Sequence, residues 1–180
     1  MKASLAIVGA LLGCWALAAA AQPLEKSTAS AGRYEVPIEV ARPAGEGPFP
    51  PVLYIHAKRG FEDEDRAHMR ALAAQGFLVL APDWQQGNMI ERWPDRHYPE
   101  TEADVEAGLN ALLARNDVCK GPVGVVGVSR GPYFAIRLAA KRPQDIGQLQ
   151  ACAAVGQALL MRAWEEAFTP FDVPVAQLLL

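Results

Sequence analysis

Short apolar runs alternate with amphipathic stretches from about residue 50 onward. The runs at 52–56, 77–81 and 123–128 have the length of buried β-strands and are apolar at almost every position. Helices are predicted at 62–75, which has acids in its first turn and Gly76 just past its end, and at 130–141, which Pro143 stops. Strands of this kind that alternate with helices are typical of a mostly parallel sheet with helices on both faces. The pattern therefore predicts an α/β fold.

Further elements extend this alternation in both directions. Thr101, with Asp104 three residues later, predicts a capping box at the start of another helix. That helix has Val105, Leu109 and Leu112 on one face. The apolar pattern also predicts strands at 34–41, 149–155 and 173–180 and a helix at 158–168.

The first residues have a different character. Lys2 is followed by an apolar stretch over 3–21 that ends in three alanines, which predicts a signal peptide at 1–21. We therefore expect export to the periplasm or beyond the cell. The stretch is only marginally long enough for a retained membrane span. A lipoprotein anchored at Cys14 is the alternative, and it is less favoured because Cys14 comes early and the apolar run continues past it.

The polar and small residues at 22–32 predict a linker, so the folded domain is expected at 33–180. The net charge is −3 and no basic run is present, which argues against nucleic acid as a partner. The cysteines show no metal-ligand spacing, and the sequence indicates neither a metal nor a cofactor.

The stretch VVGVSRGPYF holds the candidate nucleophile. Ser129 stands between Gly127 and Gly131, at the junction of the strand predicted at 123–128 and the helix predicted at 130–141. A sharp strand-to-helix turn exposes a serine and holds it rigidly, and glycine is favoured two residues before and after because bulkier side chains would collide. The helix that follows aims its first N–H groups at the site, where they can stabilise an oxyanion.

Two further stretches have the same order and spacing as in a known family. They are PVLYIHAKRG, ending at Gly60, and ALAAQGFLVLAPDW, ending at Trp84. Together with the serine turn they resemble the dienelactone hydrolase family of α/β-hydrolases over roughly 48–180. The resemblance implies the α/β-hydrolase fold. It also implies a small-molecule substrate, a carboxylic ester or lactone, that is hydrolysed through an acyl-enzyme.

The resemblance also implies roles for individual residues. Ser129 would be the nucleophile, and the backbone N–H groups of Arg130 and Lys58 would hold the oxyanion. The family proper carries cysteine at the nucleophile, glutamate where this chain has Ala57, and commonly glycine where it has Pro132. A generic serine esterase is therefore the expected activity.

The partners of the serine do not follow it in this sequence. In this fold the acid and the histidine come after the nucleophile, whereas His56, His68 and His97 all precede it. The alternating pattern also stops before the last strand of the fold, so we expect a C-terminally incomplete hydrolase domain. An inactive relative or binding module is an alternative function, and a serine peptidase relative is another.

The remaining candidates have plain structural interpretations beside the functional ones. His56 ends a buried strand and is expected to be a structural histidine under the oxyanion loop, and His68 is expected to be solvated. His97 lies in a long aromatic loop that can overhang the site. It could act as a base, contact substrate or be a plain loop residue. Asp83 is expected to cap a turn, and the acids at 62–65 are expected to favour a helix N-terminus rather than bind metal. The residues proposed to wall the pocket are Trp84, Trp93, His97 and Tyr98.

Overall fold

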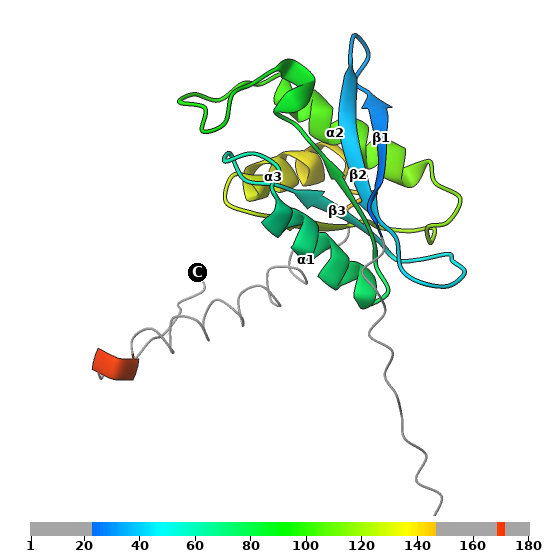
Figure 1. The fold of residues 1–180 in the computed structure, drawn as a ribbon. Helices are drawn as coiled ribbons and strands as arrows, with labels where there is room; N and C mark the ends of the chain where they lie inside the picture. The colour runs from blue at the N-terminus through cyan, green and yellow to red at the C-terminus, as the bar shows by residue number, and fades with distance from the viewer. Residues whose placement is uncertain (1–22, 147–168, 172–180) are drawn as a thin grey trace, which may run out of the picture.

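The computed structural model describes residues 23–146 and 169–171, and the elements predicted at 149–155, 158–168 and 173–180 lie outside that part. A five-stranded sheet in the order β1-β2-β4-β3-β5 forms the centre of the molecule (Figure 1). The strands are β1 (Glu25–Ser30), β2 (Glu35–Ala41), β3 (Pro51–Ile55), β4 (Leu78–Pro82) and β5 (Gly124–Gly127).

The sheet is mostly parallel. Strand β3 runs parallel to both β4 and β5, while β2 is antiparallel to β4 and to β1. Strand β2 alone therefore opposes the direction of the other strands. The carboxyl ends of β3, β4 and β5 consequently meet at one end of the sheet, where ligands bind in open α/β folds.

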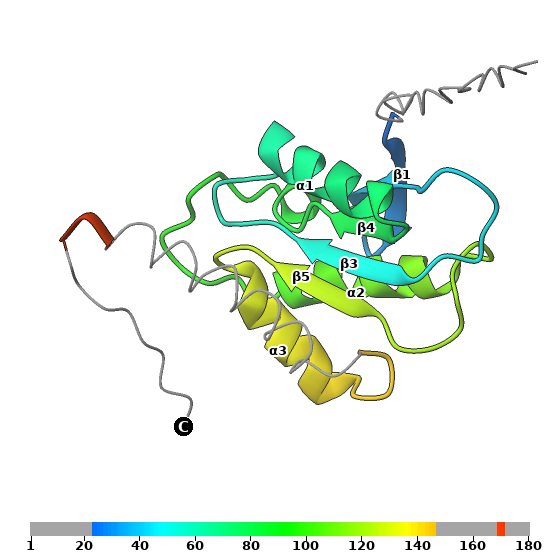
Figure 2. The ribbon, with the colours of Figure 1, turned by 90° about the horizontal axis from the view of Figure 1, so that it is seen from below.

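Helices cover both faces of this sheet. Figure 2 shows α1 (Asp63–Ala74) on one face and both α2 (Thr101–Leu113) and α3 (Gly131–Lys141) on the other. The chain also forms short 3₁₀ turns, η1 (Gln86–Asn88) and η2 (Thr169–Phe171). The layered α/β architecture predicted from the apolar pattern is thus confirmed in the described part of the chain.

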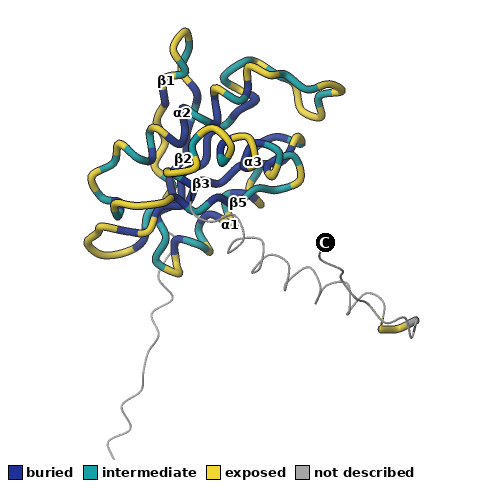
Figure 3. Tube along the Cα trace, turned by 180° about the vertical axis from the view of Figure 1, so that it is seen from behind, coloured by how far each residue is buried: buried dark blue, intermediate teal, exposed yellow. Residues whose placement is uncertain are grey.

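The alternation of side chains along β3 explains the two layers of core. Leu53 and Ile55 pack with Leu109 of α2 and Phe134 of α3. The side chain of Val52 points to the opposite face of the sheet, where it packs against the buried side of α1. Because successive residues of a strand face opposite sides, an apolar strand such as β3 can be buried on both. Figure 3 shows the buried centre, with the exposed segments gathered in the connecting loops.

The structure differs from the sequence-based expectation in the segment 22–32. Glu25–Ser30, expected within a linker, forms β1 and pairs along its length with β2. Only Ala29 of this strand is buried, so the strand has almost no apolar face that a sequence pattern could reveal. Backbone pairing with β2 supplies its hydrogen bonds instead.

The start of α2 also differs. Glu100 occupies the N-cap, and the Thr101 hydroxyl donates to Tyr98 O at 2.5 Å rather than capping the helix. Asp104 is fully buried and accepts hydrogen bonds from Tyr34 Oη and Asn88 Nδ2, both at 2.6 Å. The predicted capping box is therefore wrong, because tertiary partners bind the carboxylate that would have completed it.

Candidate active site

Ser129 occupies a sharp turn between β5 and α3. Its φ is 52°, in the left-handed region that residues other than glycine seldom adopt, and its side chain is exposed. Strand β5 ends at Gly127 and α3 begins at Gly131, so the strand–turn–helix context predicted from the sequence is present. Pro132 lies in the first turn of α3, where its missing N–H leaves no hydrogen bond unmade.

The two glycines are required by backbone packing. A Cβ atom on Gly127 would lie 2.6 Å from the backbone of Gly131 and of Pro132. A Cβ on Gly131 would lie 2.5 Å from Ile55 O. These contacts are far shorter than van der Waals separations and involve backbone atoms that cannot rotate away. The turn therefore excludes any side chain at either position.

A small cavity lies beside this turn. It has a volume of about 160 Å³, and its walls include Lys58, Trp84, His97, Tyr98 and Arg130. The structure thus brings together the two residues expected to donate to an oxyanion and three of the four aromatic or imidazole residues expected to wall a pocket.

Trp93 lies in an adjoining cavity. That cavity, of about 540 Å³, is formed by the loop between η1 and α2, and Tyr98 also lines it. The Trp93 ring is 62% exposed, and Lys58 Nζ stands 5.8 Å from its centroid. Trp93 thus lines this larger cavity and not the smaller one.

Two residues that line the smaller cavity have backbone N–H groups without a hydrogen-bond partner in the described part of the chain. The structure records no hydrogen bond from Lys58 N or Arg130 N among residues 23–146 and 169–171. Most backbone N–H groups in folded proteins have partners, so these two unpaired donors are open to an acceptor. Carbonyl oxygens that gain negative charge are acceptors of this kind.

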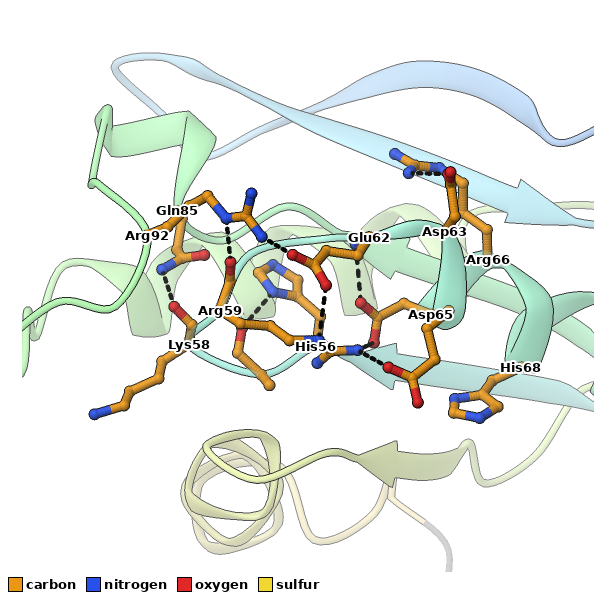
Figure 4. Close-up of polar contacts among 12 residues, drawn as sticks. His56, Lys58, Arg59, Glu62, Asp63, Asp65, Arg66, His68, Gln85 and Arg92 are labelled. Atoms are coloured by element: carbon orange, nitrogen blue, oxygen red, sulfur yellow. Dashed lines mark hydrogen bonds and ion pairs between the residues drawn. The ribbon is translucent and has the colours of Figure 1, made fainter.

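Charged residues connect the loop after β3 to the neighbouring segments (Figure 4). Arg59 donates to Glu62, Glu64 and Asp65 at 3.1 Å each. Arg92 donates to Arg59 O at 2.5 Å and forms an ion pair with Glu62. These contacts tie the loop to α1 on one side and to the η1–α2 loop on the other.

The acidic run at 62–65 serves the start of α1, as expected from the sequence. Glu62 is the N-cap, and its backbone N–H donates to Asp65 Oδ2 at 2.9 Å in a capping box. Asp65 is fully buried and also accepts from Tyr54 Oη at 2.9 Å. Burial together with this carboxylate raises the pKa of Tyr54. In the described residues no group of three or more His, Cys, Asp and Glu side chains could hold a metal ion.

The three histidines lie in different surroundings. His56 is fully buried under the loop after β3, as predicted, and its Nδ1 lies 2.8 Å from Ala57 O. His68 is exposed on α1 and contacts Tyr54 Oη at 3.1 Å through Nδ1. His97 is the histidine, among the described residues, that lines the smaller cavity.

His97 belongs to a cluster that the sequence did not reveal. Its Nε2 lies 3.1 Å from Tyr133 Oη, and that hydroxyl donates to Glu102 Oε1 at 2.8 Å. Tyr133 is on α3 and Glu102 on α2, so the cluster joins the loop to both helices. Burial raises the pKa of Glu102, but hydrogen bonds from Tyr133, Arg137 and Lys141 outweigh it and leave that pKa lowered.

Asp83 follows β4 and has the turn role expected of it. Its Oδ1 accepts from the backbone N–H groups of Gln85 at 3.3 Å and Gln86 at 3.0 Å. Burial raises the pKa of Asp83, but the contact with His56 and these two N–H groups lower it by more, so the net shift is downward. The carboxylate is therefore charged at neutral pH.

None of the helices in the described residues combines the length and the apolar character that crossing a membrane requires.

Comparison with known proteins relates the fold to two solved structures. The protein m3DLH superposes with a TM-score of 0.60 at 21% identity, over 71% of this chain and 57% of that one. A dienelactone hydrolase-like promiscuous phosphotriesterase from metagenomic libraries superposes with a TM-score of 0.56 at 23% identity, over 66% of this chain and 54% of that one. The chain thus spans little more than half the length of these proteins, and at this identity the likeness shows the fold.

A segment of the chain also matches glutamate 5-kinase of Thermus thermophilus. The match is 56% identical over 59 residues, which is 31% of this chain and 16% of the kinase. A match of that extent describes one segment and does not assign the chain to a family. The model of the dienelactone hydrolase family, in contrast, matches residues 37–154, which include every element from β3 to α3 and the serine turn. With the α/β-hydrolase fold and this match over more than half of its length, the chain belongs to the dienelactone hydrolase family.

Proposed function

We propose that the chain carries the nucleophile of a secreted serine hydrolase that cleaves carboxylic esters or lactones through Ser129. The observation that supports this most directly is the backbone at Ser129. Its φ of 52° is held between Gly127 and Gly131, neither of which tolerates a side chain. A strained residue in an exposed turn beside a cavity is characteristic of functional sites. Membership of the dienelactone hydrolase family supports the same reaction class.

In the proposed reaction, Ser129 Oγ bonds to the substrate carbonyl carbon while a base takes the hydroxyl proton. The carbonyl oxygen becomes an oxyanion and accepts from the N–H groups of Lys58 and Arg130, which line the same cavity. The carbon–oxygen bond to the leaving group then breaks, and the proton passes to the departing alkoxide. Water repeats the sequence on the acyl-enzyme and releases the acid.

The proposed reaction requires a base for the Ser129 proton. No hydrogen bond joins Ser129 to a histidine within residues 23–146 and 169–171. His97 lines the cavity and is the candidate base in the described part of the chain. The absence of a recorded serine–histidine bond favours, as second candidate, an inactive relative that binds ligand at the same cavity.

Labelling with a fluorophosphonate probe separates these candidates. We expect the wild-type chain to be labelled and to hydrolyse p-nitrophenyl esters, and Ser129→Ala to do neither. His97→Gln should lower labelling if His97 is the base, whereas the matched variant His68→Gln should leave it unchanged. A folded wild-type chain that resists labelling would favour the inactive binding protein. Turnover of dipeptide amides above that of esters would favour a peptidase.

Export through the leader at 1–21 is part of the proposal and has its own test. Expression with the full leader in a bacterial host should give a periplasmic protein that begins at Gln22. A lipid-modified Cys14 would identify a lipoprotein instead.

A further inference from the structure

We propose that His56 is a positioning residue that sets the direction of the Lys58 N–H by fixing the Ala57–Lys58 peptide, and that Asp83 holds His56 in place. This inference rests on the proposed function, because it assigns the Lys58 N–H to the substrate oxyanion. It adds a role for a fully buried histidine that the reaction itself does not use.

The first step is the contact between the imidazole and the peptide. His56 Nδ1 lies 2.8 Å from Ala57 O, and a carbonyl oxygen can only accept a hydrogen bond. Nδ1 must therefore carry the proton. Gly60 N–H donates to the same oxygen at 3.3 Å. The Ala57 carbonyl is thus held on the side of the loop that faces the buried ring.

The second step follows from peptide geometry. The cis peptide bond among the described residues lies between Gly47 and Pro48, so the Ala57–Lys58 peptide is trans. In a trans peptide the C=O and N–H bonds point in opposite directions. With Ala57 O directed at His56, the Lys58 N–H points away from the ring. Lys58 lines the cavity beside Ser129, and its N–H has no recorded partner in the described chain.

The next peptide of the loop is fixed as well. Lys58 O accepts from Trp93 N–H at 2.8 Å. The same oxygen accepts from Gln85 Nε2 at 3.0 Å (Figure 4). The Lys58 backbone is therefore held at its carbonyl by the loop after β4 and, one peptide earlier, by His56. Because the Ala57 and Lys58 carbonyls are both hydrogen-bonded, the Lys58 N–H that lies between them in the backbone has little freedom to rotate.

The last step concerns what holds the ring. His56 stacks on Trp84 with ring centroids 5.1 Å apart and planes inclined by 13°, and Trp84 Nε1 donates to His56 O at 3.1 Å. His56 Nε2 lies 3.6 Å from Asp83 Oδ1 and makes no hydrogen bond with the described residues. Asp83 is itself bound by backbone N–H groups at η1. The imidazole is thus held at its face by Trp84 and at Nδ1 by Ala57 O, and its Nε2 stands beside the Asp83 carboxylate.

Two amide substitutions of His56 distinguish this positioning role from a contribution to packing alone. In His56→Asn the side-chain amide nitrogen takes the place of Nδ1, so the donor to Ala57 O is kept. In His56→Gln the amide nitrogen lies nearer the place of Nε2, so that donor is lost. For Ser129-dependent ester hydrolysis we expect His56→Gln to lower kcat by about 10- to 100-fold with KM little changed, because an oxyanion donor acts in the transition state. His56→Asn should stay within about 5-fold of wild type.

A second readout does not need turnover, so failure of the proposed function and failure of this inference can be told apart. In ¹⁵N NMR of the wild-type chain, we expect a proton on His56 Nδ1. We also expect a larger change in the shift and exchange rate of the Lys58 amide in His56→Gln than in His56→Asn. If His56→Gln does not fold, Asp83→Asn replaces it and should move the Lys58 amide in the same direction. An unprotonated Nδ1, or equal effects of the two amide variants on the Lys58 amide, would overturn the inference.

Discussion

Gly131 at the start of α3 lies directly over the carbonyl oxygen of Ile55 at the end of β3. A Cβ atom on Gly131 would stand 2.5 Å from that oxygen, which also accepts the Val128 N–H at 3.0 Å. The backbone of the serine turn therefore packs directly against the backbone at the end of β3. The loop that carries Lys58 also begins at the end of β3. The two proposed oxyanion donors, Lys58 and Arg130, are therefore both positioned by the end of this strand.

The first prediction follows from this close approach. Gly131→Ala should lower the free energy of unfolding by about 1–3 kcal/mol, because an added methyl group can be placed only by moving one of the two backbones. Gly124→Ala in β5 is the matched control. A Cβ there would meet its nearest atom at 3.5 Å, an ordinary contact, and should change the unfolding free energy by less than about 0.5 kcal/mol. Urea denaturation measures both, and equal losses would contradict the prediction.

The second prediction concerns backbone strain at Ser129, whose φ is 52°. Left-handed backbone costs a residue with a Cβ atom about 1–2 kcal/mol, and glycine avoids most of that cost. Ser129→Gly should therefore be more stable than Ser129→Ala by about 1 kcal/mol in thermal or urea unfolding. Both variants remove the proposed nucleophile.

Ser27 provides the control for this comparison. It is exposed in the extended strand β1, where glycine is less favourable than alanine. The order of stability of the glycine and alanine variants should therefore be reversed at Ser27. The same order at both positions would show that Ser129 is not strained.

The fold could be predicted from the sequence where apolar side chains are buried in a regular pattern. The strand predicted at 52–56 corresponds to β3, which is buried at every position, and the helix predicted at 130–141 corresponds to α3. Strand β1 was not predicted, because only Ala29 of this strand is buried and its hydrogen bonds come from pairing with β2. Local patterns report side-chain burial and carry little information about edge pairing.

The site was predictable only in part for a similar reason. Glycines around Ser129 are a local signal of a tight turn, and they made Ser129 the candidate nucleophile. The role of Asp104 depends on Tyr34, which lies 70 residues away in sequence. The cluster of His97, Tyr133 and Glu102 joins a loop to two helices. Such partners become visible only when the topology has brought the elements together.

The third prediction tests that cluster. Tyr133 Oη donates to Glu102 and contacts His97, so Tyr133→Phe should free the loop that carries His97 from α3. Loss of a hydrogen bond worth about 1 kcal/mol would raise the population of the open loop by about 5-fold. Trypsin cleavage after Arg96 should then accelerate by about that factor.

Arg33, in the turn between β1 and β2, gives an internal control for this experiment. Cleavage after Arg33 should proceed at the same rate in the wild type and in Tyr133→Phe. A parallel rise at both arginines would indicate general destabilisation and not release of the loop.

The fourth prediction concerns Asp117, which accepts from Arg115 Nε at 2.7 Å and Nη2 at 2.8 Å and from Arg42 Nε at 3.3 Å. The bond with Arg115 is the largest cause that lowers the pKa of Asp117 below its usual 3.8. A lowered pKa means that the folded state binds the proton less readily than the unfolded chain does. The stabilising contribution is therefore fully present above pH 3.8 and is lost as the pH falls through the lower pKa of the folded protein.

Asp117→Asn should consequently lower the unfolding free energy at neutral pH by about 1–2 kcal/mol, the range for a hydrogen-bonded carboxylate of this kind. The difference from wild type should shrink as the pH is lowered, because the wild-type carboxylate then becomes neutral too. Glu25→Gln is the matched control, since Glu25 pairs with the same Arg115 at 3.2 Å from an exposed position. An exposed pair of that kind should contribute less than about 0.5 kcal/mol. Urea denaturation from about pH 7 down to about pH 3 measures the difference, and a gap between wild type and Asp117→Asn that stays constant over this range would contradict the assignment.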